Sequence, residues 1–267
     1  CCTCRQVMKI LLLGKNGQVG WELQRSLALL GELIALDRTP INSVYGNLAG
    51  DLSDIFGLRD TIRAVRPDVI VNAAAYTAVD KAESDRHMAY RVNALASQAM
   101  AEEALALDAL LVHYSTDYVF NGGGSVAWKE DDVVAPINYY GATKLEGEQL
   151  ITASGCRHLI FRTSWVYAAR GNNFAKTMLR LAKDRLTLNV IADQIGAPTG
   201  ADLLADVATG ALQQVLLRPQ LCGIYHLAPT GEVSWHAYAQ YTIDYARVLG
   251  EQLAVQSIDP IGTTQYP

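Results

Sequence analysis

Short apolar runs alternate with helical patterns through the first two-thirds of the chain, and this alternation limits the fold more than any other feature. The apolar runs have the length of buried strands and occupy residues 8–13, 33–36, 69–72, 109–114 and 157–161. The helical patterns lie between them, at residues 18–30, 54–65, 84–107 and 139–153. Strands that alternate with helices form a parallel sheet with crossover helices. The sequence therefore predicts an α/β fold with a doubly wound parallel sheet.

The pattern becomes mixed beyond residue 165. Three further helices are predicted there, at residues 172–183, 201–216 and 234–249. We interpret residues 8–164 as the first domain and residues 165–267 as mainly a smaller C-terminal substrate-binding lobe, with the chain crossing between the two. Met8 reads as a natural start, so residues 1–7 are expected to be an extension. The sequence stops at Pro267 in what reads as a loop, and a C-terminal segment is expected to be missing.

Composition and charge exclude several classes of protein. The 267 residues carry a net charge of −5 and no run rich in lysine or arginine, which argues against a nucleic-acid partner. No apolar stretch reaches the roughly 18 residues that a membrane span needs. Cys1, Cys2 and Cys4 lie in the extension while Cys156 and Cys222 are isolated, a spacing that provides neither a zinc site nor a disulfide framework. We expect a reduced cytoplasmic protein.

Three glycines lie between the first predicted strand and the first predicted helix. Gly14, Gly17 and Gly20 have the spacing G-x-x-G-x-x-G. Glycine lets the chain turn tightly and lets backbone N–H groups approach a pyrophosphate, while the helix N-terminus adds partial positive charge. A strand before the turn and a helix after it are the context that a dinucleotide-binding turn requires. The turn therefore predicts a Rossmann-like domain that binds NADH or NADPH.

Residues near this turn point to the rest of the cofactor. Asp37 follows the second predicted strand, where a carboxylate accepts hydrogen bonds from a ribose 2′-OH and so favours NADH. Arg38 comes next and can accommodate a 2′-phosphate, so the sequence favours NADH with NADPH tolerated. Asp51 and Leu52 either flank the adenine or form the turn before a helix. Small side chains after the strand at residues 69–72 would let the cofactor approach the sheet; they are Ala73, Ala74 and Ala75.

A tyrosine and a lysine share one face of the helix predicted at residues 139–153. Tyr140 and Lys144 are four residues apart, and side chains at that spacing are neighbours on a helix. An adjacent ammonium would lower the pKa of the tyrosine towards the working pH and make it a usable general acid. Tyr139 lies off that shared face. Thr116 follows the strand at residues 109–114, where a hydroxyl can orient a reacting carbonyl towards Tyr140.

The ordered set of motifs resembles the extended short-chain dehydrogenases/reductases, and within them the branch that reduces 4-keto nucleotide sugars. Besides the glycine turn, the matching segments are RPDVIVNAAAYTAVDKAE at 66–83, HYSTDYVF at 113–120, YGATKLEGE at 140–148, FRTSWVY at 161–167, residues 172–182 and DQIGAPT at 193–199. They span residues 9–267, nearly the whole chain. The resemblance implies reduction of the 4-keto group of dTDP-4-dehydro-L-rhamnose to dTDP-L-rhamnose, a step in the synthesis of O-antigen and cell-surface polysaccharides.

The resemblance also implies roles for single residues. Thr116, Tyr140 and Lys144 would be catalytic, and Lys144 would also hold the nicotinamide ribose. Gln18 and Val19 would contact the cofactor, with the alanines near it. Asp117 and Trp165 would contact the dTDP-sugar, the indole packing on the sugar. The family's magnesium-linked homodimer would use carboxylates, of which Glu22 and Asp202 lie at matching positions and a further one would lie beyond Pro267. A solvated surface position is an equal interpretation of Glu22.

Two other functions remain open at this stage. Dehydratases of the same fold place Asp-Glu after the threonine, whereas Tyr118 follows Asp117 here, so the elimination machinery is missing. An epimerase is harder to exclude, because it needs only the return of the hydride. A non-catalytic NADP-binding regulatory subunit would share the fold, which does not by itself fix function. The intact set of threonine, tyrosine and lysine favours a reductase.

Overall fold

The computed structural model describes residues 7–265 and divides the chain into two compact units. The first unit contains residues up to 163 and residues 202–227, and the second contains residues 164–201 and those from 228 onward. The predicted domain boundary after residue 164 lies close to residue 163, where the chain first passes from the first unit to the second. Residues 202–227, which the sequence assigned to the smaller lobe, belong instead to the first unit. Six residues of the predicted extension, three cysteines among them, lie outside the described residues.

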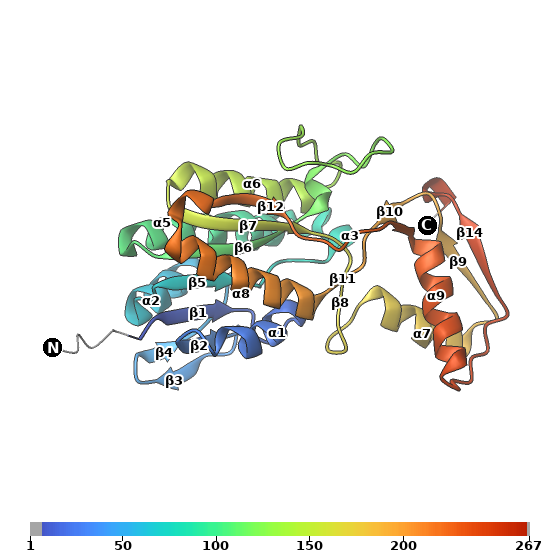
Figure 1. Ribbon diagram of the computed structural model, residues 1–267, viewed down its shortest axis with the longest axis horizontal. Coiled ribbons are helices and arrows are strands. Elements are labelled where there is room, and N and C mark those ends of the chain that lie inside the picture. The colour runs from blue at the N-terminus through green and yellow to red at the C-terminus, as the bar shows by residue number, and fades with distance from the viewer. Residues whose placement is uncertain (1–6, 266–267) are drawn as a thin grey trace. The chain divides into compact units, whose positions relative to one another are not determined.

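A six-stranded parallel sheet forms the centre of the first unit (Figure 1). Its strand order is β12-β7-β6-β5-β1-β2. The strands are β1 (Lys9–Leu13), β2 (Glu32–Leu36), β5 (Val69–Asn72), β6 (Leu110–Thr116), β7 (Arg157–Thr163) and β12 (Gly223–His226). A short antiparallel hairpin, β3 (Ile41–Ser43) with β4 (Gly46–Leu48), follows β2. The predicted doubly wound α/β fold is confirmed.

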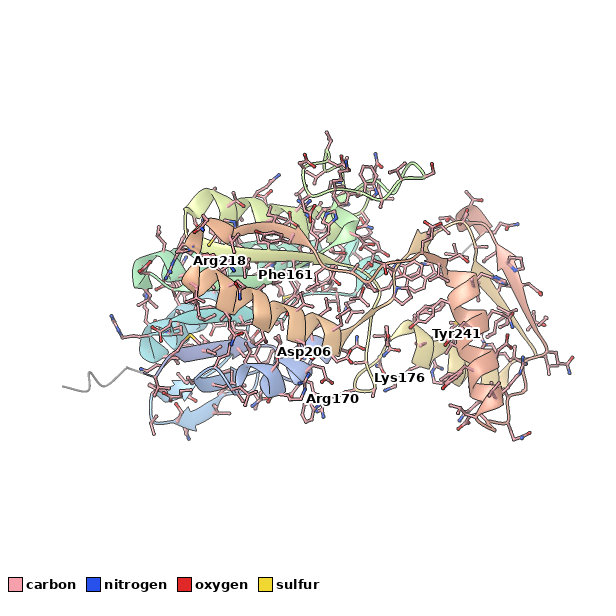
Figure 2. All side chains as sticks on the ribbon, in the orientation of Figure 1. Phe161, Arg170, Lys176, Asp206, Arg218 and Tyr241 are labelled. Carbon is pink, nitrogen blue, oxygen red and sulfur yellow. The ribbon has the colours of Figure 1, made fainter. Side chains whose placement is uncertain are left out.

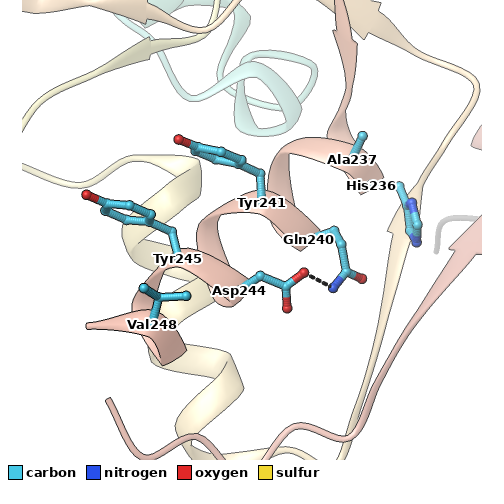
Figure 3. A pocket seen from close by; sticks show the side chains of 7 residues that line it. All are labelled: His236, Ala237, Gln240, Tyr241, Asp244, Tyr245 and Val248. Atoms are coloured by element: carbon cyan, nitrogen blue, oxygen red, sulfur yellow. Dashed lines mark hydrogen bonds between the residues drawn. The ribbon is translucent and has the colours of Figure 1, made fainter. Parts of the chain in front are cut away.

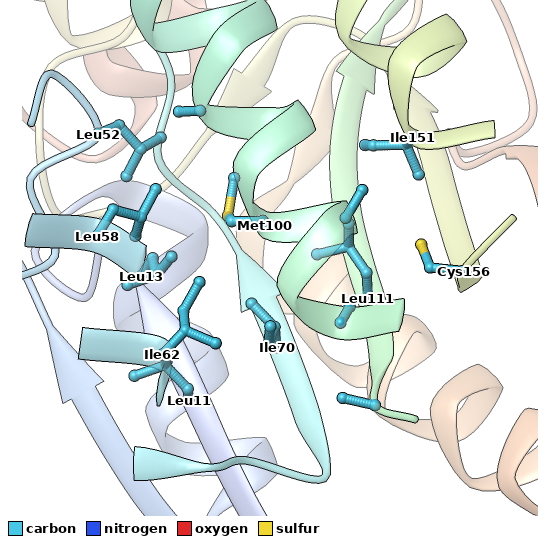
Figure 4. Close-up of a cluster of buried hydrophobic side chains, with 14 of the residues drawn as sticks. Leu11, Leu13, Leu52, Leu58, Ile62, Ile70, Met100, Leu111, Ile151 and Cys156 are labelled. Carbon is cyan, nitrogen blue, oxygen red and sulfur yellow. The ribbon is translucent and has the colours of Figure 1, made fainter. Parts of the chain in front are cut away.

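Helices cover both faces of this sheet (Figure 1). One face carries α2 (Ile55–Val65), α5 (Ala96–Leu107) and α6 (Tyr139–Ser154), and the other carries α1 (Gln18–Leu27) and α8 (Ala201–Leu217). Alternate strand residues such as Leu11, Ile70 and Leu111 pack against Ile62 and Met100 of the first group in a buried core (Figure 4). Strands buried on both faces explain why their sequences are continuously apolar.

The structure differs from the sequence prediction in two elements. The single helix predicted at residues 84–107 is divided into α4 (Arg86–Tyr90), a π-helical turn η1 (Arg91–Leu95) and α5, after the short α3 (Val79–Ala82). Within η1 the buried amide of Asn93 hydrogen-bonds the backbone of Tyr76, a tertiary contact that helical periodicity does not reveal. Strand β12 was not predicted, because its four residues GIYH lack the pattern of a buried strand.

The second unit is a small α/β assembly with its own core. It contains α7 (Phe174–Asp184) and α9 (Trp235–Val248), both close to their predicted bounds. Three two-stranded pairs accompany them: β8 (Val166–Tyr167) with β11 (Thr199–Gly200), β9 (Thr187–Ile191) with β14 (Ser257–Ile261), and β10 (Ile195–Gly196) with β13 (Val233–Ser234). Met178, Leu188 and Ile243 are among the residues of its core. Within residues 7–265, no helix has the length and apolar character needed to cross a membrane.

Candidate active site

The glycine turn has the backbone geometry of a phosphate cradle. Gly14 adopts a left-handed φ of +85°, and a Cβ there would lie 2.8 Å from Ala74. A Cβ on Gly20 would lie 2.0 Å from the carbonyl oxygen of Gly14, so α1 can approach the turn only with glycine at this position. Gly17 is the N-cap of α1 and provides no side chain to cap its N–H groups. The turn therefore fits a pyrophosphate at a helix N-terminus.

The residues expected near the ribose and adenine of the cofactor differ in whether they contact the glycine turn. The carboxylate of Asp37 accepts hydrogen bonds from the side chain of Asn16 in the glycine turn and from the backbone N–H of Thr39, at 2.9 Å for the latter. In contrast, the carboxylate of Asp51 accepts from Ser53, and the side chain of Leu52 is buried in the core. Asp37 thus borders the predicted cradle, while Asp51 and Leu52 have the contacts of a structural turn.

Thr116 and Tyr140 meet at the carboxyl end of the sheet. Thr116 is the last residue of β6, and Tyr140 lies in the first turn of α6, where the side chain of Asn138 caps the helix. The Thr116 hydroxyl lies beside the Tyr140 phenol and donates to a carboxylate oxygen of Asp117 at 3.1 Å. The ring of Tyr118 packs edge-on against that of Tyr140 at 5.7 Å. Thr116 and Tyr140 therefore bring two hydroxyl groups to this end of the sheet.

The electrostatics of Tyr140 differ from the expectation that Lys144 lowers its pKa. Burial raises the pKa of Tyr140, the hydrogen bond with Thr116 opposes this shift, and Asp117 and Tyr118 add to it. The amine of Lys144 donates to the carbonyl oxygen of Tyr114 at 2.6 Å and contacts His113. Burial also lowers the pKa of Lys144 to about 8, against the opposing charge of Glu148.

Two buried groups beside Lys144 were missed by sequence reasoning. Nε2 of His113 lies 3.1 Å from Nζ of Lys144, and Nδ1 lies 3.1 Å from the side-chain nitrogen of Asn72. All three side chains are 1% exposed. Burial and the Lys144 charge hold the pKa of His113 well below its usual value. The signal was available, since both residues fall in matching segments, but apolar strand periodicity gives no reason to inspect an inward-facing histidine.

Trp165 lies in the second unit and is held by aromatic stacking. Its ring stacks on that of Trp235 at 3.4 Å, and a Cβ on Gly196 would lie 2.5 Å from the indole. Its φ of +46° lies in the left-handed region, which is rare for a bulky residue and costs about 1–3 kcal/mol. Its role towards the sugar stays a prediction.

The predicted magnesium ligands do not form a metal site among residues 7–265. No three His, Cys, Asp or Glu side chains there lie close enough together to hold an ion. Glu22 lies 4.0 Å from the guanidinium of Arg25, which binds Asp206 on α8 at 2.7 Å (Asp206 is labelled in Figure 2). Asp202 is exposed. The carboxylates of residues 7–265 in one chain therefore do not complete a magnesium site by themselves.

A shallow hollow on α9 contains none of the predicted site residues. Its volume is about 470 Å³, and its lining includes His236, Tyr241 and Tyr245 (Figure 3). The two tyrosine rings stack on each other at 6.1 Å. Every residue that lines the hollow belongs to α9, and its one carboxylate, Asp244, accepts a hydrogen bond from Gln240, so we place the candidate active site at the carboxyl end of the sheet.

Comparison with known proteins fits this geometry. A family model described as "RmlD substrate binding domain" matches residues 8–267. The chain belongs to the RmlD substrate binding domain family. Two relatives named dTDP-4-dehydrorhamnose reductase, from Salmonella typhimurium and Escherichia coli K12, are 54% and 53% identical over 260 residues. Each alignment covers 97% of this chain and 85% of the relative.

Solved structures of the RmlD family share the fold. The crystal structure of dTDP-4-dehydrorhamnose reductase from Bacillus anthracis, in complex with NADP, matches with a TM-score of 0.83 and 35% identity. The match covers 97% of this chain and 85% of that one. The enzyme of that name from Clostridium acetobutylicum matches with a TM-score of 0.82, also at 35% identity, over 97% of this chain and 86% of its own.

Proposed function

We propose that the protein reduces the 4-keto group of dTDP-4-dehydro-L-rhamnose to dTDP-L-rhamnose with NADH or NADPH. The observation that carries this proposal is the 54% identity, over 97% of the chain, with a relative of the corresponding name. The chemistry of the site supports it, because a glycine cradle and a hydroxyl pair lie on neighbouring parts of one parallel sheet. The dTDP-sugar is the substrate that we assign to this site.

The proposed mechanism uses three side chains of the first unit. A bound nicotinamide would supply a hydride to C4 of the sugar. Tyr140 donates its phenolic proton to the alkoxide oxygen that forms at C4, and the high pKa produced by burial keeps that proton in place until the alkoxide develops. Thr116 hydrogen-bonds the same oxygen and orients it. A proton from solvent restores the phenol between turnovers, and Lys144 holds the nicotinamide ribose.

The cofactor would lie along the cradle and along the residues that follow the carboxyl ends of β5 and β2. Gly14, Gly17 and Gly20 leave room for the pyrophosphate, and Gln18 and Val19 begin the helix beneath it. Ala73 and Ala74 border the cradle, with Ala74 adjacent to Gly14, and Ala75 follows them in the sequence. Asp37 favours the ribose of NADH, while Arg38 beside it accommodates the 2′-phosphate of NADPH. We therefore propose that both cofactors are used.

An assay with the purified protein tests the proposal. NADH or NADPH is mixed with dTDP-4-dehydro-L-rhamnose, and the product is identified by mass and NMR spectroscopy. We expect stoichiometric cofactor oxidation and dTDP-L-rhamnose. An isomeric 4-keto sugar without net oxidation would indicate an epimerase, and binding of cofactor with no turnover would indicate a regulatory subunit.

The Tyr140→Phe variant tests the proton donor. Loss of the phenolic proton should reduce turnover by about 10²–10⁴-fold while cofactor affinity stays within a few-fold. The matched control is Tyr139→Phe, because that ring lies under the guanidinium of Arg86 at 4.7 Å and takes no part in the hydroxyl pair. Equal turnover in wild type and Tyr140→Phe would remove this residue from the mechanism.

A further inference from the structure

The amine of Lys144 lies at the end of a buried chain of hydrogen bonds that the proposed mechanism does not use. The backbone N–H of Ala74 donates to Oδ1 of Asn72 at 3.1 Å. The side-chain nitrogen of Asn72 lies 3.1 Å from Nδ1 of His113, and Nε2 of the same ring lies 3.1 Å from Nζ of Lys144. The chain starts beside the glycine cradle, since Ala74 is the residue against which Gly14 packs.

The direction of every bond in this chain follows from its first member. A backbone N–H can only donate, so the atom of Asn72 that faces Ala74 must be the amide oxygen. The amide nitrogen of Asn72 therefore faces His113 and donates to Nδ1. A neutral imidazole that accepts at Nδ1 carries its proton on Nε2. Because burial disfavours the imidazolium, the His113 ring presents an N–H donor to Lys144.

An ammonium has three donors and no acceptor, so it cannot accept from Nε2–H, whereas an uncharged amine can. We propose that Asn72 and His113 are positioning residues that favour the uncharged amine of Lys144, coupling its protonation to the hydrogen-bond direction of the whole chain. This inference rests on the proposed function only where it predicts activity. If Lys144 is charged while His113 keeps its proton on Nε2, two donors face each other. To avoid this, the proton of His113 must move to Nδ1 and the side-chain amide of Asn72 must rotate so that its oxygen accepts from Nδ1–H. The hydrogen bond from the backbone N–H of Ala74 to Asn72 is then lost.

The surroundings of Lys144 offer its charge little compensation. Glu148, one turn along α6, is the carboxylate that favours the ammonium, but Arg162 of β7 binds it through three contacts of 2.7–3.2 Å. From β6, only His113 and the carbonyl oxygen of Tyr114 contact the amine. Asp117 of the 3₁₀ turn η2 (Asp117–Val119) acts on Tyr140 instead. The lowering of the pKa of Lys144 to about 8 by burial agrees with this balance.

The tautomer of the His113 imidazole can be measured in the wild-type protein. In protein labelled with ¹⁵N-histidine, the ¹⁵N shifts distinguish the protonated ring nitrogen from the other one. The His113 signal is the one missing from His113→Phe. At about pH 9, above the pKa of about 8 of Lys144, we expect the proton on Nε2. A proton on Nδ1 at this pH, or a positively charged ring, would overturn the proposal.

The Asn72→Asp variant reverses the chain with nearly unchanged shape. A carboxylate accepts from both Ala74 and Nδ1–H, so Nε2 becomes the acceptor for a charged Lys144. We expect the His113 proton to move to Nδ1. We also expect the basic limb of the pH profile of kcat/KM for the cofactor to move up by at least about one pH unit, a tenfold change in the protonation equilibrium.

The double variant Asn72→Asp/His113→Phe separates this relay from the added charge. It keeps the carboxylate but removes the imidazole that connects it to Lys144. If its basic limb moves as far as that of Asn72→Asp, charge alone is the cause and the relay is wrong. If the sugar assay fails in the wild type, the proposed function fails, whereas the tautomer measurement still decides the inference. The wild-type spectrum also decides it if a variant does not fold.

Discussion

Asp117 is a carboxyl group whose environment opposes its charge. It follows Thr116 at the carboxyl end of β6, and burial raises its pKa from 3.8 to about 6 despite hydrogen bonds from Thr116 and the local backbone. A carboxyl with a raised folded-state pKa contributes stability that is present below its unfolded value and is lost as pH rises through its folded value. Ionised Asp117 therefore destabilises the fold at neutral pH.

Asp117→Asn should change how stability depends on pH. Between about pH 4 and pH 6, the melting temperature of the variant should rise relative to wild type, because wild type alone loses the contribution of the protonated carboxyl. Thermal unfolding at several pH values measures this difference. The control is Asp60→Asn on the exposed surface of α2, which should show no such trend. Parallel curves for Asp117→Asn and wild type would show that burial does not perturb this group.

Lys144 shows that the spacing of residues in a sequence does not predict the direction of a long side chain. The spacing of Tyr140 and Lys144 predicted a shared helix face but not the direction of a flexible four-carbon side chain. The amine turns towards Tyr114 and His113 because those groups offer buried hydrogen-bond partners from β6. Sequence identifies the helix and its register, whereas the partners come from a strand that is distant in sequence. The sequence predicted that Lys144 lowers the pKa of Tyr140, whereas burial raises the pKa of Tyr140 in the structure.

At the scale of elements, the approach of α1 to the turn after β1 depends on Gly20. Gly20→Ala would place a Cβ 2.0 Å from the backbone oxygen of Gly14, where no flexible side chain can move away. We expect a loss of about 1–3 kcal/mol, the usual cost of overpacking, together with weaker cofactor binding. Urea denaturation and calorimetric titration with NADPH measure the two effects.

Gly210→Ala is the matched control for this substitution. Gly210 lies in α8, and a Cβ there would meet nothing within 4 Å. Alanine in a helix is favoured over glycine, so this variant should gain about 0.4–1 kcal/mol. If Gly20→Ala were as stable as Gly210→Ala, the close contact between α1 and the turn would not exist.

The helix that carries Tyr140 and Lys144 is attached to β7 by a buried ion pair. The carboxylate of Glu148 binds the guanidinium of Arg162 at 2.7 Å, and the two side chains are 2% and 6% exposed. Glu148→Gln leaves the arginine charge uncompensated, which should cost about 3–5 kcal/mol. Asp206→Asn removes an exposed pair with Arg25 and should cost no more than about 1 kcal/mol. Similar losses in the two variants would contradict this assignment.

Elements with a regular apolar period could be predicted from the sequence, and elements defined by tertiary contacts could not. The strands at residues 69–72 and 157–161 and the helix at residues 139–153 have bounds close to those observed. The π-helical turn η1 depends on the contact between Asn93 and Tyr76, and β12 depends on pairing with β7. Neither contact leaves a local signal, because both partners are remote in sequence.

At the scale of the whole molecule, the chain returns to its first unit after leaving it. Residues 202–227 contribute nearly all of α8 and all of β12 to the first unit, so the C-terminal third is divided between the two units. The sequence predicts a helix at residues 201–216 but does not predict which unit it belongs to. An amphipathic pattern does not indicate which core the helix covers. A contact across a long separation, such as Thr209 with Ser26 at 2.9 Å, supplies that information.

Metal dependence is a property of the whole protein rather than of one element. Magnesium prefers octahedral oxygen ligands, including one or two carboxylates. Among residues 7–265 no three candidate ligands cluster, and Arg25 already supplies positive charge to Glu22 and Asp206. Treatment with EDTA should therefore leave turnover unchanged within about two-fold, a difference of roughly 0.4 kcal/mol in barrier.

Sedimentation of the same samples should give one mass with and without EDTA. Re-addition of Mg²⁺ is the control. Glu22→Gln should behave as wild type, because we expect the Glu22 carboxylate of the wild type to hold no magnesium ion. A fall in mass or turnover that Mg²⁺ restores, and that Glu22→Gln abolishes, would show that the protein assembles a metal site from carboxylates of separate copies, as the family resemblance implied, and would make Arg25 a counter-ion that moves when the metal binds.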